Sequence, residues 1–154
     1  MILLDSDVLL VDLRYRNDPR FLINQQALQR LKTENHVVGI TVQALLETVG
    51  VLSFNVSSAH VAHLPRQLAL QYGLTIFPDL SHVPDYAGCT VQEIVGQLGF
   101  QMALGDAVQV VQIAHYASFA DCLLTWNAKH FQGKAPVAVL TPQDWLSQQS
   151  GSTP

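Results

Sequence analysis

Charged side chains are scarce in this 154-residue sequence: they make up 13% of it, against about a quarter in an average soluble domain. Apolar residues make up 49%, which excludes an intrinsically disordered chain, because disorder needs low hydrophobicity and high charge. Eight lysines and arginines stand against 12 acidic residues, so the formal net charge is -4. Proteins that hold nucleic acid chiefly by releasing counterions are basic, so simple electrostatic coating of DNA or RNA is disfavoured.

Long apolar runs and cysteine pairs are also missing. No apolar stretch approaches the roughly 18 residues that a membrane span needs, and Asp5, Asp7 and Asp12 interrupt the first one. The same acids, together with the lack of a basic start, argue against a signal peptide. Cys89 and Cys122 have no CxxC partner, which disfavours a disulfide framework or a zinc site. We therefore expect a cytoplasmic protein without a membrane partner.

Short apolar runs alternate with segments of helical periodicity along the whole chain. Fully apolar strands between helices indicate a parallel sheet that is covered on both faces. The predicted fold class is therefore α/β, a three-layer α/β/α sandwich with a parallel sheet of about five strands. It spans residues 1–147, and the small polar residues of 148–154 predict a disordered tail. The predicted strands are 2–4, 36–40, 74–77, 122–125 and 137–140.

Polar residues at the predicted helix starts indicate how the helices are capped. Asp7 is a candidate cap for the first helix, and Thr41 for the helix after the second strand. Thr90 with Glu93 forms one capping box, and Asp106 with Gln109 is predicted to form another. A helix predicted from 57 or 58 to 72 should break or kink at Pro65.

Three acids fall where a parallel sheet binds its ligands, beyond the carboxyl ends of the strands. Asp5 directly follows the first strand, Glu47 lies opposite the apolar stripe of its helix, and Asp106 opens a buried helix. No lysine or arginine occurs between Arg66 and Lys129. Carboxylates that converge stay ionised together only when a cation bridges them. Oxygen ligands without Cys or His select Mg²⁺ or Mn²⁺. Taken singly, these acids also have structural explanations as helix caps or solvated side chains.

Four segments, in order, resemble the motifs of the PIN-domain family. The first is a strand that ends in Asp-Ser-Asp, the second a helix with a metal-site Glu, and the third an Asp that opens a buried helix. The fourth is a strand that ends in Ser/Thr-x-Asp/Asn before a one-turn helix. In this sequence they are residues 2–10, 41–47, 105–107 and 123–131.

The resemblance implies a five-stranded parallel sheet and a Mg²⁺- or Mn²⁺-dependent endoribonuclease that acts on RNA. Asp5, Glu47 and Asp106 match the metal-binding acids of the family, while Ser6 and Thr125 match its supporting hydroxyls. Small members of this size are often the VapC-type toxin of a toxin–antitoxin pair. They are often homodimeric and inhibited by an antitoxin protein that blocks the acidic pocket.

The fourth motif departs from the family pattern. Many members carry a fourth acid where this chain has Asn127, which offers only a neutral oxygen. This change should weaken a second metal ion more than the first. Asp121 is a candidate substitute, although it lies at the other end of the fourth predicted strand, where it is also a candidate turn residue.

Other functions remain open at this point. A PIN-like module that binds RNA or a protein without cleaving is one, because of Asn127. A haloacid-dehalogenase-type phosphatase is disfavoured, since no lysine lies between Lys32 and Lys129. Arg14, Arg16 and Arg20 are candidate contacts for substrate phosphates, or simply a solvated helix face.

Overall fold

The computed structural model describes residues 1–79 and 88–150. In this part of the chain, five parallel strands form one sheet in the order β3-β2-β1-β4-β5, as the alternating pattern predicts. The predicted loop from Pro78 to Gly88 lies largely outside the described residues. The strands are β1 (Ile2–Leu4), β2 (Val38–Thr41), β3 (Leu74–Phe77), β4 (Cys122–Leu124) and β5 (Ala138–Leu140).

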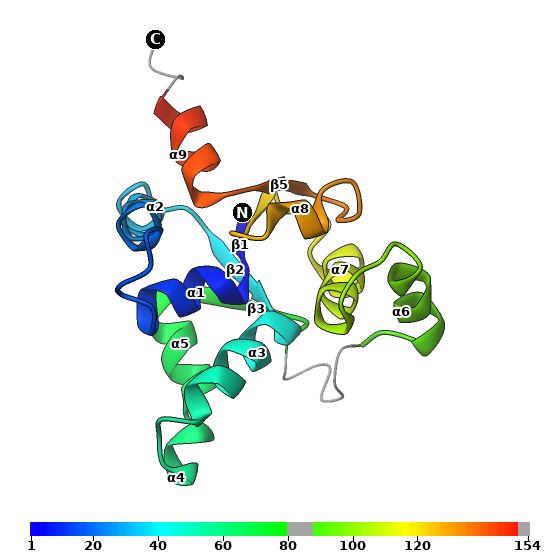
Figure 1. Ribbon diagram of the computed structural model, residues 1–154, viewed down its shortest axis with the longest axis horizontal. Helices are drawn as coiled ribbons and strands as arrows, with labels where there is room; N and C mark the ends of the chain where they lie inside the picture. Colours follow the sequence, from blue (N-terminus) through cyan, green and yellow to red (C-terminus); the bar gives the residue numbers. More distant parts are fainter. Residues whose placement is uncertain (80–87, 151–154) are drawn as a thin grey trace.

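Helices cover both faces of this sheet and give the predicted three layers (Figure 1). None of the described helices is both long enough and apolar enough to cross a membrane. They are α1 (Ser6–Leu13), α2 (Phe21–Thr33), α3 (Val42–Ser53), α4 (Ser58–Val61), α5 (Leu64–Tyr72), α6 (Val91–Leu98), α7 (Leu104–Tyr116), α8 (Ala128–Phe131) and α9 (Pro142–Ser150).

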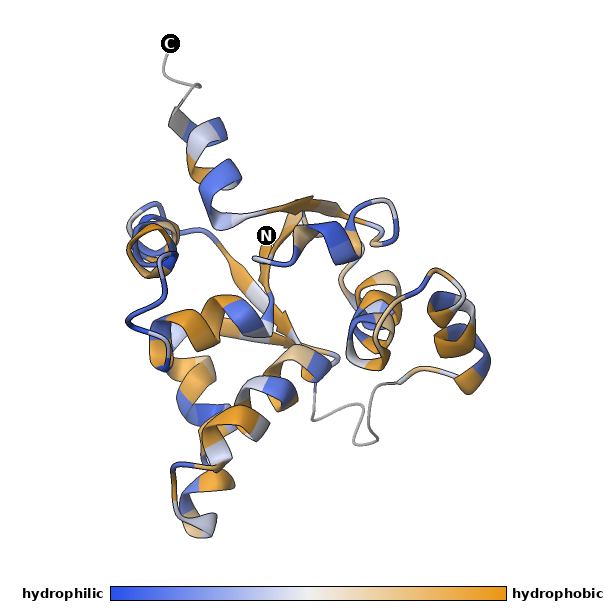
Figure 2. Ribbon diagram, viewed as in Figure 1, coloured by the Kyte–Doolittle hydropathy of each residue, from blue (hydrophilic) through white to orange (hydrophobic). Residues whose placement is uncertain are grey.

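Strand alternation divides the core into two clusters. Ile2 and Leu4 point to one face, where they pack with apolar residues of α1, α2, α3, α5 and α9. Leu3 and Leu123 point to the other face, where they pack with α7 and α8. Figure 2 shows that the strands and the helices packed against them are largely hydrophobic, in keeping with burial on both faces of the sheet. Because the central strands are buried on both faces, their ends are fixed in space, and so are the residues that follow them.

The register brings three strand ends level with one another. Leu4 pairs with Ile40 on one side and with Leu124 on the other. Asp5, Thr41 and Thr125 follow these residues directly, so they share the carboxyl edge of the sheet.

Most predicted helix boundaries are confirmed to within a few residues. Thr41 caps α3 by accepting the Ala44 N–H, and Thr90 with Glu93 forms the predicted capping box of α6. The break near Pro65 is also confirmed, because α4 ends before it and Pro65 occupies the first turn of α5, where a missing N–H costs nothing. Helix α9 continues to Ser150, so residues 148–150 are helical where the polar composition predicts a disordered tail.

Two predicted caps are wrong, and both errors concern the acidic site. Helix α7 begins at Leu104 with Ala103 as its N-cap, so Asp106 lies within the first turn and caps nothing. Helix α1 begins at Ser6, so its cap is Asp5 rather than Asp7. Both helices start earlier than predicted, which frees the side chains of Asp106 and Asp7 for other contacts.

A substitution in β2 tests the packing of the sheet. An added Cβ at Gly39 would lie 2.9 Å from Cε2 of Phe77 and 3.1 Å from Cδ2 of Leu3. We expect Gly39→Ala to lower the free energy of unfolding by about 1–3 kcal/mol, because overpacking strains a filled core. Urea denaturation measures this change.

Gly50→Ala is the matched control. Its Cβ would meet nothing within 4 Å on the exposed side of α3, so we expect a gain of up to about 1 kcal/mol from helix propensity. Equal effects of the two substitutions would contradict the packing described here.

Candidate functional site

Asp5 stands at the centre of the carboxyl edge and is 5% exposed. One carboxylate oxygen, Oδ1, accepts the Ser6 N–H at 2.7 Å, and this contact caps α1. The other, Oδ2, accepts the Thr125 hydroxyl at 2.7 Å. The turn from β1 into α1 and the end of β4 therefore hold this carboxylate from two sides.

Asp7 contacts the connection between β4 and α8. Its Oδ2 accepts the Trp126 backbone N–H at 3.0 Å and lies 3.2 Å from the Thr125 hydroxyl. That hydroxyl has one proton, and the shorter contact with Asp5 takes it. The hydroxyl oxygen also accepts the Asn127 N–H at 3.0 Å. Thr125 thus links two acids of the first motif to the fourth motif.

Glu47 and Asp106 approach the same edge from α3 and α7. The Ser6 side chain hydrogen-bonds Glu47 and lowers its pKa, although burial and the charges of Asp5 and Asp106 raise that pKa overall. One carboxylate oxygen of Asp106, Oδ2, lies 3.4 Å from Nδ1 of His130. The structure therefore brings Asp5, Glu47 and Asp106 into electrostatic contact.

Burial and mutual repulsion disfavour the charged forms of Asp5, Asp7 and Glu47. Burial raises the pKa of Asp5, and the charge of Asp106 raises it further, against hydrogen bonds that lower it. Burial raises the pKa of Asp7 to about 7, with the charge of Asp5 as the second cause. Carboxylates in this state gain free energy from any cation that joins them.

One arginine lies beside this acidic cluster. Arg20 forms a two-pronged contact with Asp18, at 2.6 and 2.8 Å, and its guanidinium lies 5.6 Å from the Trp126 ring centroid. Its charge lowers the pKa of Asp7, but less than the hydrogen bonds from Trp126 and Thr125 do. Arg20 is one of the three arginines that the sequence offers as phosphate contacts, and it lies outside the stretch from 66 to 129 that lacks bases.

Asp121 and Asn127 differ in where the structure places them. Asp121 lies at the amino end of β4 and pairs with the Met1 ammonium, so the structure does not bring it to the acidic edge. Asn127 follows β4 at the carboxyl edge, and its side chain is exposed. The departure from the family pattern at Asn127 is therefore not offset by Asp121.

The acidic side chains have the oxygen donors that a hard dication prefers, but these donors are not gathered around one point. The converging side chains offer carboxylate oxygens, which Mg²⁺ and Mn²⁺ prefer. Within residues 1–79 and 88–150, however, no three His, Cys, Asp or Glu side chains are gathered closely enough to hold one ion. Binding one ion through all three acids would require their side chains to move together.

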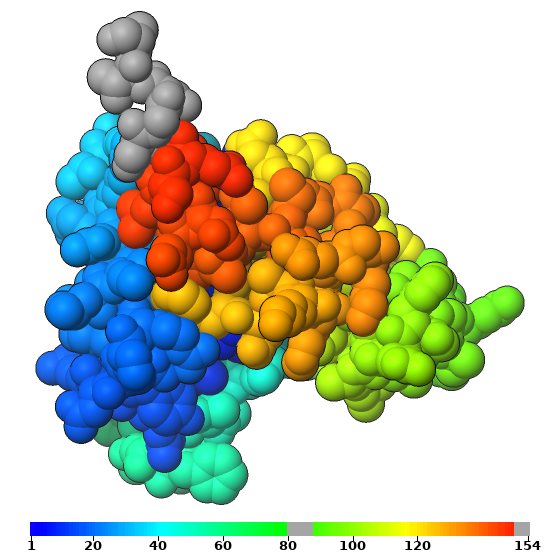
Figure 3. All heavy atoms as spheres, turned by 45° about the horizontal axis from the view of Figure 1, so that its top comes forward, coloured from blue at the N-terminus to red at the C-terminus, as the bar shows by residue number. Residues whose placement is uncertain are grey.

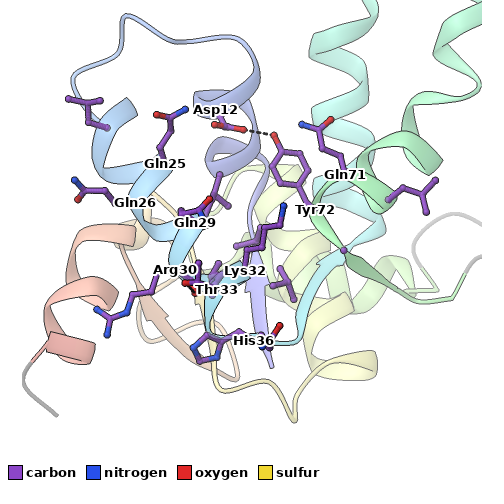
Figure 4. Close-up of a pocket in the computed structure, with 18 residues that line it drawn as sticks. Asp12, Gln25, Gln26, Gln29, Arg30, Lys32, Thr33, His36, Gln71 and Tyr72 are labelled. Atoms are coloured by element: carbon purple, nitrogen blue, oxygen red, sulfur yellow. Dashed lines mark hydrogen bonds between the residues drawn. The ribbon is translucent and has the colours of Figure 1, made fainter. Parts of the chain in front are cut away.

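A groove of about 1100 Å³ lies apart from the four acids, between α2 and α5 (Figure 4). Tyr72 donates its hydroxyl to Asp12 at 2.6 Å across one part of it. Arg30, Lys32 and His36 line it as well. Sequence reasoning missed this groove, because its walls come from segments that are about 40 residues apart.

Comparison with known proteins shows a likeness in structure alone, since neither a protein-family model nor a curated sequence matches the chain. The structure of FitAB bound to an IR36 DNA fragment is similar over 92% of this chain and 95% of that chain, at 16% identity and a TM-score of 0.57. VapBC2 from Rickettsia felis, bound to a DNA fragment from its promoter, is similar over 92% and 98%, at 16% identity and a TM-score of 0.55.

A more distant likeness is to VapC20 of Mycobacterium tuberculosis, a sarcin-ricin loop cleaving toxin, at 13% identity and a TM-score of 0.47. It covers 80% of this chain and 87% of that chain. The two nearer likenesses, together with the strand order, confirm the predicted fold class. The chain has a PIN-like fold.

Asp7→Asn tests the electrostatics of the site. A carboxyl group whose pKa is raised to about 7 in the folded state, from about 4 when unfolded, weakens the fold as pH rises through that interval. The asparagine keeps the acceptor for Trp126 but never ionises. In the absence of metal ions, we compare the free energy of unfolding of Asp7→Asn with that of the unmutated protein. We expect the difference to shift in favour of Asp7→Asn by at least about 1 kcal/mol from pH 4 to pH 8.

Asp18→Asn serves as the opposite case. Arg20 lowers the pKa of Asp18 to about 2, so its carboxylate favours folding above pH 4, and its removal should weaken the protein at pH 8. Thermal unfolding at the two pH values measures both variants. If Asp7→Asn raises the stability equally at pH 4 and pH 8, the pKa of Asp7 is not raised in the folded protein.

Proposed function

We propose that this protein is a metal-dependent endoribonuclease of the PIN-domain type and the toxin of a toxin–antitoxin pair. The convergence of Asp5, Glu47 and Asp106 at one sheet edge is the observation that carries the proposal. The order of the four motifs supports it, and so does the fold shared with FitAB and VapBC2.

Asp5, Asp106 and Glu47 would hold Mg²⁺ or Mn²⁺. A bound ion of this kind polarises a phosphoryl oxygen and makes a coordinated water a better nucleophile. The water oxygen would bond to phosphorus while the bond to the 3′ oxygen breaks, and that oxygen takes a proton. The products are then a 5′-phosphate and a 3′-hydroxyl, as the family resemblance implies.

The remaining polar residues would orient these acids. Thr125 and the Ser6 N–H fix both oxygens of Asp5, and the Ser6 side chain reaches Glu47. Asp7 is tied to the Trp126 backbone, so its role in the proposal is to hold the end of β4 rather than to bind the ion. Arg20, above the Trp126 ring and close enough for its charge to act on Asp7, would be a contact for an RNA phosphate.

Asp5→Asn tests the activity. We expect the unmutated protein to cleave single-stranded RNA with Mn²⁺ and to lose this activity with a chelator. Asp5→Asn should lower the cleavage rate at least about 100-fold, because a carboxylate of the proposed metal site is gone. Asp121→Asn, an acid at the opposite sheet edge, should cleave like the unmutated protein. Cleavage that survives either the chelator or Asp5→Asn would overturn the mechanism.

A binding module without catalysis is the second candidate, and Asn127 in place of a fourth acid favours it. Its signature in the same assay is Mn²⁺-dependent RNA binding without any cleavage. Asn127→Asp separates the two candidates further. It supplies the fourth acid of the family pattern, so it should restore cleavage only if the rest of the catalytic site is complete.

A second copy of the chain is the proposed partner for α6. Val91, Val95 and Leu98 recur at helical spacing on that helix and are exposed, at 77%, 58% and 37%. Helix α6 stands out from the body of the molecule (Figure 3). Its apolar face supports the proposed homodimer, because a contiguous exposed apolar surface marks an interaction site.

The antitoxin is the proposed partner for the groove between α2 and α5. Leu22 and Leu70 line it and are 69% and 73% exposed. Because Arg30 and Lys32 also line it, it suits a segment that combines apolar with acidic side chains. Such a segment would belong to a small protein encoded beside this one.

Leu70→Asp tests that surface. Its side chain is exposed, so folding should be unaffected, while co-purification of the antitoxin, which we expect to be a small protein encoded beside this one, should fall about tenfold or more. Val91→Asp, on the apolar face of α6, is the matched control and should leave this capture unchanged. If Val91→Asp removes the small protein and Leu70→Asp does not, the antitoxin binds elsewhere.

A further inference from the structure

Two glutamines are buried inside the otherwise apolar part of α7. Gln112 is fully buried, and its Oε1 accepts the Gln43 N–H at 3.0 Å, which ties α7 to the first turn of α3. Gln109 is 1% exposed, and its buried Nε2 has no partner at full hydrogen-bond distance and angle. The two residues have the same type and helix but different environments.

A buried amide without a full hydrogen bond lowers stability, so its presence calls for an explanation. An apolar residue at position 109 would fill the same space without this loss. The capping box that the sequence predicts does not explain Gln109, because α7 begins before Asp106. The explanation must come from what surrounds the amide.

Gln109 lies at the acidic site. It follows Asp106 by three residues, so both side chains share one face of α7. Its side chain is within reach of a weak hydrogen bond to Asp5, and this contact lowers the pKa of that carboxyl group. Asp5 already accepts the Ser6 N–H and the Thr125 hydroxyl, and an ionised carboxylate accepts about four hydrogen bonds in all. Room for a further donor therefore remains on Asp5.

We propose that Gln109 is a positioning residue for Asp5, and that its weak contact with the Asp5 carboxylate tightens into a full hydrogen bond from Nε2 when the acids close around a divalent cation. This inference rests on the proposed metal-dependent function. The donated hydrogen bond would fix the orientation of Asp5 and leave its remaining oxygen face for the ion. Groups that orient a metal ligand in this way commonly contribute about 10- to 100-fold to metal affinity.

Replacing Gln109 should therefore have opposite effects on stability without the ion and on affinity for the ion. Without it, the amide has a poor environment, so Gln109→Met should leave the melting temperature unchanged or raise it. With it, the orienting hydrogen bond is lost, so the dissociation constant for Mn²⁺ should rise about tenfold or more. Calorimetric titration of the full chain with Mn²⁺ measures the affinity, and thermal unfolding without metal ions measures stability.

Gln97→Met and Gln112→Met are the controls. Gln97 on α6 also has a buried amide atom without a full hydrogen bond, its Oε1, but it is not among the groups that shift the pKa of Asp5. Gln97→Met should therefore match Gln109→Met in stability and keep the affinity for Mn²⁺. Gln112→Met leaves the Gln43 N–H without its acceptor, so it should lower the melting temperature. Gln109→Asn, which keeps the amide but shortens its reach, should weaken Mn²⁺ binding in the same direction as Gln109→Met.

Two results would overturn the inference, and they differ from a failure of the proposed function. If Gln109→Met and Gln109→Asn bind Mn²⁺ as the unmutated protein does, Gln109 does not position Asp5, while the metal site itself stands. A lower melting temperature for Gln109→Met with unchanged affinity makes Gln109 a structural residue only. If the unmutated protein binds no Mn²⁺, or binds it equally well after Asp5→Asn, the proposed metal site and this inference both fail.

Discussion

The hydrogen bond from the Thr125 hydroxyl to the buried carboxylate of Asp5 is the contact on which the site depends. It joins the ends of β1 and β4, two central strands that are neighbours in the sheet but about 120 residues apart in sequence. Through Ser6 and Asp7 the same contact extends to the start of α1 and to the β4–α8 connection. A threonine is suited to this position, because its hydroxyl donates to one acid while it accepts a backbone N–H.

The sheet explains why negative groups are tolerated so close to one another. The three central strands, β1, β2 and β4, are buried along their whole length and almost entirely apolar, so their ends are held rigidly. The free energy gained by packing the core keeps Asp5 and Asp7 in positions that disfavour their charged forms. Functional sites are commonly places where the surrounding fold maintains an arrangement that is unfavourable in itself.

Much of the fold could be predicted from the sequence, because strand burial and the β–α alternation leave a clear periodic pattern. The pattern gives no information on which of two neighbouring acids caps a helix. That choice depends on where the helix begins. A shift of two residues made Asp5 rather than Asp7 the cap of α1, and a shift of three residues released Asp106 from the cap of α7. Gln109 left only a weak signal, a polar residue in an apolar helix, three positions after an acid. Arg20 is a candidate phosphate contact in the sequence, but its place beside Asp7 depends on segments that meet only in three dimensions. The groove between α2 and α5 left no signal, for the same reason.

The junction between β2 and α3 has a mechanical consequence. Thr41 ends the strand and Val42 begins the helix, with no residue between them, so Glu47 is carried by the sheet almost as part of it. Asp106, by contrast, follows the irregular segment from Gly99 to Ala103 that joins α6 to α7. Any adaptation of the acidic edge to ligands of different size therefore falls on the α7 side, while the α3 side acts as a fixed wall.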